Sequence, residues 1–352
     1  METRFREIDV GGTALEMGRQ IGEGAREEIR GFAAIALERV NRSMPVSRPN
    51  ALAACRDSIP YVEGYAPDML EELQGMSESS GVALEEMMLL QMRNQLRPDE
   101  DAGCTSFAIG PGISAESGAM VGQNWDNDPA LDPFTVVLKR RPQDKPAIMD
   151  ITQAGLIAYI GLNDRGIGLC MNTLPAPNRR VGVPHYFVVR GIYESGDLDD
   201  AVGAVRRAHR AIPNNLMLAT PQGPADLEIT VDDVHVLRPN GSGMVCHTNH
   251  CLHPDLVPIN DDFPELIQSN PRLARIERLF GDAGRPLGLE GIQAALKNHE
   301  DFPKSICRHA NEHPTNGFWV TVLSVIIEPE AGRMHISRGN PCEKPYETYR
   351  LN

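Results

Sequence analysis

The chain has 352 residues, 41% of them hydrophobic, so it can bury a substantial core as one large domain or two medium ones. Its formal net charge of -14 opposes binding to nucleic acid or to anionic membranes, because both require clustered excess Lys and Arg. The first ten residues lack the apolar core of a signal peptide and no long apolar run follows, which predicts a cytoplasmic protein with no membrane partner.

The first hundred residues are predicted to be helical. Thr13 and Glu16 have the spacing of a capping box, and apolar residues then recur every three or four positions up to Val40, which places them on one face of a helix. A loop containing Pro45 and Pro49 is expected to end this helix. Further helical stretches are expected at 67–76 and 84–96, followed by an acidic, turn-prone run at 97–103.

The pattern changes at Cys104, where short apolar or β-branched segments separated by Gly, Pro, Asn and Asp begin. Antiparallel strands are predicted at 104–110, 119–124, 134–139, 147–151, 157–161, 167–172, 216–219, 226–231, 234–237, 319–327 and 334–337. Helices are predicted at 186–195, 198–211, 264–280 and 289–298. Helices that flank a mostly antiparallel, two-sheet strand set indicate a layered α/β sandwich.

Cys104 stands at the junction between the two patterns. Gly103 precedes it and has no Cβ, so a thiol can approach its carbonyl closely, while Thr105 and Ser106 add neighbouring hydroxyls. This setting suits an acyl shift in which the Cys104 thiol attacks the Gly103 carbonyl and water hydrolyses the resulting ester. Scission would give Cys104 a free α-amine with a pKa near 8, so the nucleophile would acquire its own general base.

The junction, followed about twenty residues later by the run Gly122-Gln123-Asn124-Trp125-Asp126, resembles the acyl-coenzyme A:6-aminopenicillanic acid acyltransferase family, peptidase family C45, within the N-terminal-nucleophile hydrolases. The resemblance extends over nearly the whole chain. It includes a Gly-Thr-Ala-Leu-Glu-Met-Gly stretch at 12–18 and further matching segments at 161–169, 247–250 and 305–308. It implies a four-layer αββα sandwich with mostly antiparallel sheets, and it implies no cofactor and no metal.

The resemblance also implies roles for individual residues. Cys104 would be the nucleophile, and the Asn249 side-chain amide would be an oxyanion-hole donor together with a backbone N–H near Asp126. A donor of this kind contributes about 2.7–4 kcal/mol, so Asn249→Ala should damage turnover while sparing the fold. Asp126 would orient the new ammonium or an adjacent hydroxyl, and Arg308 would pair with a carboxylate near the site. The supporting residues would be Thr105, Ser106, Gln123 and Asn124.

Cleavage between Gly103 and Cys104 would leave a helical segment, 1–103, and a strand-rich catalytic segment, 104–352. We expect the two to associate in one structural domain, and a homo-oligomer is compatible with the sequence. One departure concerns Gln123, because related bile-salt and ceramide amidases carry Arg three positions before the matching Asp. An anionic substrate group at that position is therefore not predicted.

Several alternatives remain open from the residues alone. The run Cys246-His247-Thr248-Asn249-His250-Cys251-Leu252-His253 offers five metal-ligand side chains, although zinc sites usually draw ligand pairs from two separated segments. Asn124, Trp125 and Asp126 are also compatible with a turn, the run 163–166 with a hairpin, Asn249 with a backbone cap and Arg308 with a surface charge.

Three activities compete at this stage. Hydrolysis of a small-molecule amide through an acyl-thioester on Cys104 is preferred, because acyl transfer to an amine such as a β-lactam nucleus requires a second organised site. A non-catalytic metal- or ligand-binding protein using the 246–253 cluster is the alternative outside enzyme chemistry, since a fold does not determine a function.

Overall fold

The computed structural model describes residues 3–41, 46–96, 103–116, 118–239, 241–263, 268–313 and 317–352. Within this part of the chain the strands are β1 (Glu7–Gly12), β2 (Cys104–Ile109), β3 (Met120–Asn127), β4 (Thr135–Pro142), β5 (Ile148–Gln153), β6 (Ile160–Asn163), β7 (Gly168–Thr173), β8 (Asn214–Thr220), β9 (Gly223–Ile229), β10 (Val234–Leu237), β11 (Met244–His247), β12 (Val320–Glu328), β13 (Arg333–Arg338) and β14 (Glu347–Arg350). They form an eight-stranded sheet in the order β1-β4-β5-β6-β7-β8-β9-β10 and a six-stranded sheet in the order β11-β2-β3-β12-β13-β14.

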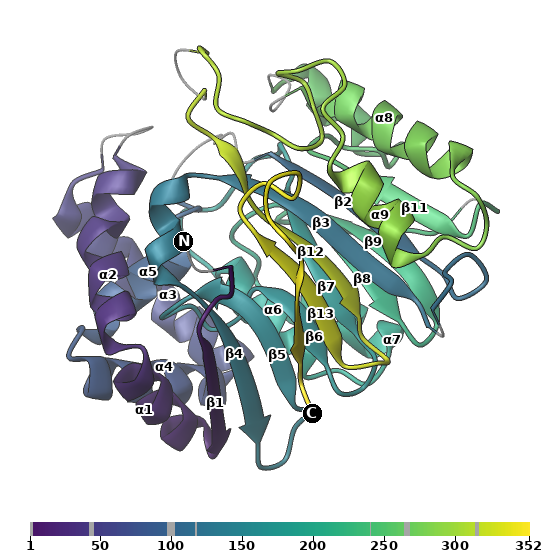
Figure 1. Ribbon diagram of the computed structural model, residues 1–352. Coiled ribbons are helices and arrows are strands. Elements are labelled where there is room, and N and C mark those ends of the chain that lie inside the picture. The colour runs from purple at the N-terminus through teal and green to yellow at the C-terminus, as the bar shows by residue number, and fades with distance from the viewer. Residues whose placement is uncertain are drawn as a thin grey trace.

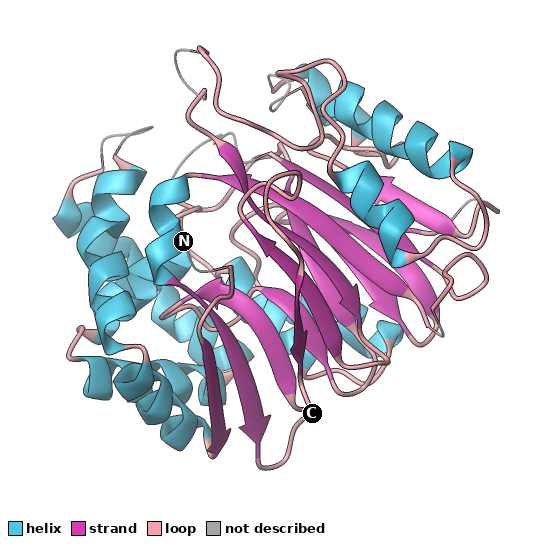
Figure 2. Ribbon diagram, viewed as in Figure 1, coloured by secondary structure: helices cyan, strands magenta, loops and turns pink. Residues whose placement is uncertain are grey.

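Helices cover the outer face of each sheet (Figures 1 and 2). The described α-helices are α1 (Ala14–Gly24), α2 (Arg26–Val40), α3 (Arg48–Tyr65), α4 (Pro67–Ser80), α5 (Leu84–Met92), α6 (His185–Tyr193), α7 (Leu198–Arg207), α8 (Ser269–Asp282) and α9 (Leu289–Leu296). The first seven lie on the side of the eight-stranded sheet, whereas α8 and α9 cover the six-stranded sheet through a separate apolar cluster. The predicted αββα sandwich is therefore confirmed.

The two sheets face each other through β2, β3 and β12 on one side and β7, β8 and β9 on the other. Their strands are buried on both faces, which explains why the sequence reads as short continuous apolar runs and not as strict alternation. All strand pairs are antiparallel except β1 with β4, which are parallel. No helix among the described residues is long and apolar enough to cross a membrane.

The amino-terminal block differs from the sequence prediction in three ways. The capping box of Thr13 and Glu16 is confirmed, but the expected single helix is two helices, because α1 ends at Gly24 and Ala25 caps it. Helix α3 begins at Arg48, within the predicted loop, and continues through a stretch for which we predicted no element. Strand β1 was not predicted, so strands do not begin at Cys104. The expected acidic run at 97–103 lies outside the described residues except for Gly103.

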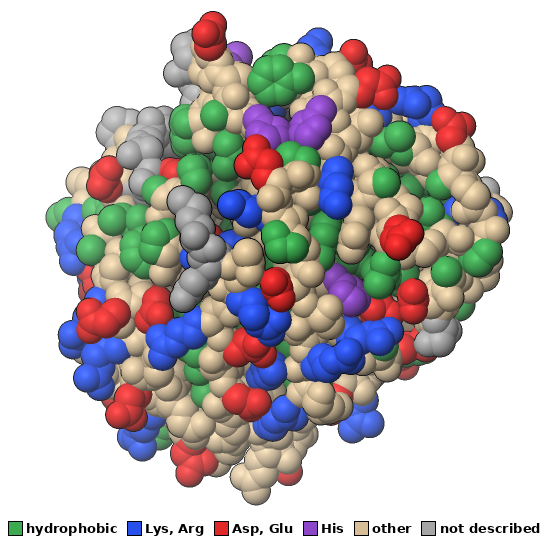
Figure 3. Space-filling model, viewed as in Figure 1, with side chains coloured by type: hydrophobic (Ala, Val, Ile, Leu, Met, Phe, Trp, Pro, Cys, Tyr) green, Lys and Arg blue, Asp and Glu red, His purple; other side chains and the backbone are tan. Residues whose placement is uncertain are grey.

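Later elements match their predictions more closely. The run 163–166 is a hairpin turn between β6 and β7, in which the Asn163 Oδ1 accepts hydrogen bonds from the N–H groups of Arg165 and Ile167. Gly166 has a φ of +82°, which favours glycine at that position. The face shown in Figure 3 carries interspersed acidic and basic side chains.

A buried ion-pair network joins the amino-terminal helices to the strand-rich part of the chain. Glu72 on α4 pairs with Arg140 on β4 at 2.8 Å and with Arg190 on α6 at 3.1 Å, while Arg140 also pairs with Asp150 on β5. These four side chains are at most 2% exposed. The network therefore crosses the boundary between the segments 1–103 and 104–352.

Arg140→Met is expected to destabilise the fold by about 3–5 kcal/mol, because it leaves Glu72 and Asp150 buried with less compensating charge. Urea unfolding in a Cys104→Ala background would measure this loss on a single uncut chain. Arg19→Met is the matched control, since Arg19 pairs with Glu78 on the exposed surface and its loss should cost less than about 1 kcal/mol. Equal effects of the two substitutions would contradict the assignment.

Candidate active site

Cys104 is the first residue of β2, and it lies in the interior of the six-stranded sheet opposite Trp125 of β3. The side chain is 2% exposed. Burial, together with the nearby Asp126 carboxyl, raises the pKa of the Cys104 thiol to about 12. In the intact chain this thiol is therefore protonated at neutral pH, and it needs a nearby base or cation to become a nucleophile.

Hydrogen bonds hold both sides of the Gly103-Cys104 peptide bond. The Asp126 backbone N–H donates to the Gly103 carbonyl oxygen at 2.8 Å. The Cys104 N–H donates to the Asn249 Oδ1 at 2.9 Å. A carbonyl that accepts such a bond is polarised, and the two hydrogen bonds hold both ends of this peptide bond in place.

Gly103 fits a space that a side chain would fill. A Cβ at this position would lie 2.7 Å from the Asp126 Oδ2, which is closer than real Cβ contacts come. The glycine is thus required by the close approach of Asp126 to the junction. From the sequence we predicted that Gly103 lets the thiol approach its carbonyl. The structure shows that its missing Cβ also makes room for the Asp126 side chain.

Asn249 follows β11 and reaches the junction with its side-chain amide. The Oδ1 accepts from the Cys104 N–H and from the Arg272 Nη2 at 2.8 Å, while the Nδ2 donates to the Thr173 carbonyl oxygen at 3.0 Å. The Ser269 Oγ accepts from the Asn249 N–H at 2.7 Å. In the intact chain the amide oxygen thus faces Cys104, and its nitrogen binds backbone of β7.

Arg272 is a site residue that the sequence analysis missed. It lies on α8, it is fully buried, and its Nη1 donates to the Cys104 carbonyl oxygen and to the Thr105 Oγ1. A signal was present, because Arg272, Ile276 and Phe280 are spaced four apart on the buried face of a predicted helix. A charged residue on an apolar face is almost never buried unless it is paired. Arg272 thus brings a cation that lowers the pKa of both the Cys104 thiol and the Asp126 carboxyl.

Asp126, on β3, is the acidic group of the site. Burial raises the pKa of its carboxyl to about 6, while Arg272, Arg308 and a hydrogen bond from Thr321 oppose that rise. The Thr321 Oγ1 donates to the Asp126 Oδ1 at 2.7 Å and accepts from the Arg308 N–H at 2.9 Å. Arg308 is buried, so the surface-charge alternative for this residue is wrong.

Scission should lower the Asp126 pKa, because a new ammonium at Cys104 would favour the ionised carboxylate. In the uncut Cys104→Ala chain we expect the carboxyl to titrate near pH 6 and to be mostly ionised above it. In the cleaved wild type we expect a midpoint below that value. Difference infrared spectra of the carboxylate band, with Asp126→Asn derivatives as blanks, would measure both midpoints, and equal midpoints would show that no ammonium forms beside Asp126.

The four supporting residues, Thr105, Ser106, Gln123 and Asn124, contact different parts of the structure. Thr105 contacts Arg272, and Ser106 accepts from the Asn172 Nδ2 at 2.6 Å in the interface between the sheets. Gln123 bonds to the backbone of Met171, and its side chain also lowers the Cys104 pKa. The Asn124 Nδ2 donates to the carbonyl oxygens of Leu296, the last residue of α9, and of Ile306. Asn124 and Asp126 lie within β3 and not in a turn.

The 246–253 run does not converge on one point. The His247 Nε2 lies 2.8 Å from the Glu228 Oε1, and His250 contacts the Ser269 Oγ. Cys246 and Cys251 pack in two different apolar clusters. His253 instead groups with His235 and Asp255 near the surface. Strand β11 ends at His247, and the rest of the run lies in the loop that follows.

Comparison with protein families and curated proteins gives consistent results. A family model described as acyl-coenzyme A:6-aminopenicillanic acid acyl-transferase matches residues 113–343, which is more than half of the chain. A protein of Emericella nidulans described as acyl-coenzyme A:6-aminopenicillanic-acid-acyltransferase 40 kDa form is 24% identical over 347 residues. That alignment covers 96% of this chain and 93% of the relative. It therefore extends over the region around Gly103 and Cys104 as well as over the strand-rich part that follows.

Solved structures give more distant matches. A variant of conjugated bile acid hydrolase from Clostridium perfringens has 11% identity and a TM-score of 0.45, covering 71% of this chain and 97% of that one. Penicillin V acylase from Agrobacterium tumefaciens has 9% identity and a TM-score of 0.38, covering 68% of this chain and 75% of that one.

Proposed function

The chain belongs to the acyl-coenzyme A:6-aminopenicillanic acid acyl-transferase family, and on that basis we propose that it is a self-cleaving cysteine amidohydrolase with Cys104 as its nucleophile. The observation that carries the proposal is the arrangement around one peptide bond. The Gly103 carbonyl is bound by the Asp126 N–H, and the Cys104 nitrogen is bound by Asn249. Buried backbone groups need partners in any protein, and the Asp126 N–H continues the pairing of β2 with β3. What supports the proposal is that a side chain, that of Asn249, binds the Cys104 nitrogen.

Maturation is proposed to begin with attack of the Cys104 sulfur on the Gly103 carbonyl carbon. The carbon–nitrogen bond breaks, the nitrogen takes the thiol proton, and Gly103 is left as a thioester on Cys104. Water then hydrolyses that thioester to the Gly103 carboxylate and a free thiol. The Asp126 N–H stabilises the developing oxyanion, since it already contacts that oxygen.

Turnover is proposed to reuse the same positions. The new α-amine of Cys104 accepts the thiol proton, and the Asn249 Oδ1 and Asp126 orient it. Departure of Gly103 leaves the Asp126 N–H open to a substrate carbonyl. A substrate that also accepts from the Asn249 Nδ2 would replace the Thr173 carbonyl oxygen as its partner. The amine half of the substrate leaves first, and water hydrolyses the acyl-thioester.

Both fragments are proposed to remain in one structural domain after cleavage. Strand β1 of the first fragment pairs with β4 of the second, and the Glu72 network spans the same boundary. Separation would expose paired backbone groups and leave buried charges without partners.

Hydrolysis and acyl transfer differ only in what accepts the acyl group. A panel of acyl amides with varied acyl and amine halves, assayed with and without added 6-aminopenicillanic acid, would separate them. We expect release of free acid and amine in water alone. Acyl transfer as the main activity would be indicated by a new amide that forms faster than the free acid, and an inert protein would contradict the enzyme proposal.

Gly103→Ala is expected to slow maturation at least about a hundredfold, because the added methyl collides with the Asp126 side chain and displaces the junction. The rate of appearance of the two fragments after synthesis in a cell-free system would measure it. Gly112→Ala is the control, since a Cβ there meets nothing within 4 Å. Normal cleavage of Gly103→Ala would contradict the proposed role of this close approach.

A further inference from the structure

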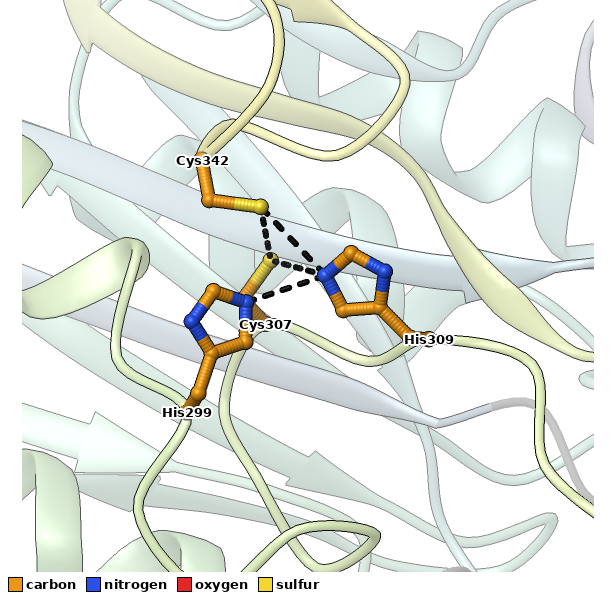
Figure 4. Close-up of side chains that lie close together, drawn as sticks. All are labelled: His299, Cys307, His309 and Cys342. Carbon is orange, nitrogen blue, oxygen red and sulfur yellow. Dashed lines mark hydrogen bonds between the residues drawn. The ribbon is translucent and has the colours of Figure 1, made fainter.

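A second cluster of reactive side chains lies apart from the Cys104 junction and is not used by the proposed chemistry. It consists of His299, Cys307, His309 and Cys342 (Figure 4). His299 follows α9, Cys307 and His309 lie in the loop before β12, and Cys342 lies between β13 and β14. Three separate stretches of chain therefore bring two thiols and two imidazoles to one point.

The distances among these atoms match a tetrahedral site. The two sulfurs are 3.7 Å apart, and the His309 Nε2 lies 3.7 Å from the Cys307 Sγ and 3.3 Å from the Cys342 Sγ. Zinc bonds of about 2.3 Å to sulfur and about 2.0–2.1 Å to nitrogen place tetrahedral ligands roughly 3.8 Å apart for two sulfurs and roughly 3.5 Å for sulfur and nitrogen. The observed separations agree with these values within a few tenths of an ångström.

The two imidazole rings of the cluster also contact each other. The Nε2 atoms of His299 and His309 lie 2.9 Å apart, and all four ligand atoms lie within 4.8 Å of one another. A zinc ion between the rings requires about 3.3 Å between these nitrogens, so the two nitrogens have to move apart by a few tenths of an ångström. The His299 ligand atom lies no farther than 4.8 Å from either sulfur, and a zinc ion would draw it to about 3.5 Å. His299 is exposed and has room for that movement.

The surroundings orient the ligands. The Glu343 Oε1 lies 3.8 Å from the Nδ1 of His309, on the opposite side of the ring from the cluster. The Asn340 Nδ2 lies 3.5 Å from the Cys307 Sγ and donates to the Arg308 carbonyl oxygen at 2.7 Å. A carboxylate beside the second ring nitrogen and an amide donor to a thiolate are the usual outer partners of zinc ligands.

We propose that His299, Cys307, His309 and Cys342 bind one zinc ion in a closed, structural site. Binding releases two thiol protons, so that one divalent ion balances two thiolates and two neutral imidazoles. All four positions are filled by protein, which leaves no place for a reactive water. The sequence analysis expected no metal and considered only the 246–253 run, whose side chains lie elsewhere.

The site would fix the segment that carries Arg308. Arg308 lies between the ligands Cys307 and His309, and its backbone pairs with Thr321, which donates to Asp126. The metal would hold this segment against the loop between β13 and β14. His299 and Cys342 are exposed, which gives an ion access from solvent.

Elemental analysis of protein produced without a polyhistidine tag and dialysed against metal-free buffer tests the proposal. We expect one zinc ion per chain in the wild type and less than a tenth of that in Cys342→Ser and in His299→Ala. Cys251→Ser and His209→Ala are the controls and should keep the metal, since neither belongs to the cluster. Loss of zinc in Cys251→Ser with retention in Cys342→Ser would overturn the assignment in favour of the 246–253 run.

Cobalt substitution provides a readout that does not depend on the folding of variants. Chelated wild-type protein should take up one Co²⁺ and show tetrahedral d–d bands together with thiolate-to-cobalt charge transfer, and Cys342→Ser should show weaker charge transfer. Wild type that binds neither ion would overturn the proposal. A Cys307-Cys342 disulfide, seen as a mass two daltons lower, would overturn it as well. These results are independent of any outcome at Cys104.

Discussion

Replacing Cys104 with Ala is expected to abolish amide hydrolysis and to leave the Gly103-Cys104 bond intact. The substitution removes the proposed nucleophile, and loss of a nucleophile lowers turnover by about ten-thousandfold or more in other enzymes. Because Cys104 is buried at the start of a strand that is paired on both sides, the smaller side chain should still fold. Turnover of a responsive acyl amide and the intact mass of the variant would be measured together.

Two control variants make this result specific. Cys55→Ala removes a fully buried cysteine from helix α3, which packs against α4 and α5, and should keep wild-type turnover and cleavage. Cys104→Ser keeps a hydroxyl in place of the thiol and should be slow in both reactions, because a hydroxyl ionises much less readily. Wild-type hydrolysis by a folded Cys104→Ala protein would show that another residue attacks the substrate.

Replacing Asn249 with Ala is expected to lower kcat about 10²–10³-fold, as removal of an oxyanion-hole donor does elsewhere. It should also cost about 1–3 kcal/mol of stability, because the Arg272 guanidinium and the Cys104 N–H lose the oxygen that they share. These contacts lead us to expect a loss of stability, whereas from the sequence we expected Asn249→Ala to spare the fold. Steady-state kinetics and urea unfolding would separate the two effects.

Asn249→Asp distinguishes the two ends of the amide. A carboxylate still accepts from the Cys104 nitrogen and from Arg272, but it cannot donate to a substrate carbonyl. If donation from the Nδ2 stabilises the oxyanion, kcat falls in Asn249→Asp as it does in Asn249→Ala, with KM little changed. Wild-type kcat in Asn249→Asp would restrict the residue to orienting the Cys104 nitrogen.

The sequence predicts most of the fold because the local patterns are strong. The strands after Cys104 are apolar runs bounded by turn residues, and the capping box of Thr13 and Glu16 is local chemistry. Helix α3 was missed because it contains Pro49 and Pro60. Pro49 lies in the first helical turn, where an N–H has no partner within the helix, so its absence does not weaken the helix. The Ser47 side chain caps the helix by accepting a hydrogen bond from the Asn50 N–H. Strand β1 was missed because its only described partner, β4, is distant in the chain.

The site was predicted only as far as single residues and short motifs reveal it. Cys104, Asp126 and Asn249 come together as the resemblance implies, although their roles in chemistry stay predictions. Arg272 enters from α8, and a helical pattern does not say what a buried charge will contact. The cluster of His299, Cys307, His309 and Cys342 has no regular spacing, because three loops supply it. Such convergence is set by packing between layers, which a one-dimensional pattern does not record.

The most direct test of the proposed cleavage between Gly103 and Cys104 is intact-mass analysis of freshly purified wild-type protein, with amino-terminal sequencing of the products. The proposal predicts two fragments in equal amounts, residues 1–103 and 104–352, with Cys104 as the new amino terminus of the second. A wild type that remains one uncut chain while it hydrolyses amides would contradict the proposal that cleavage gives Cys104 the free α-amine needed for catalysis.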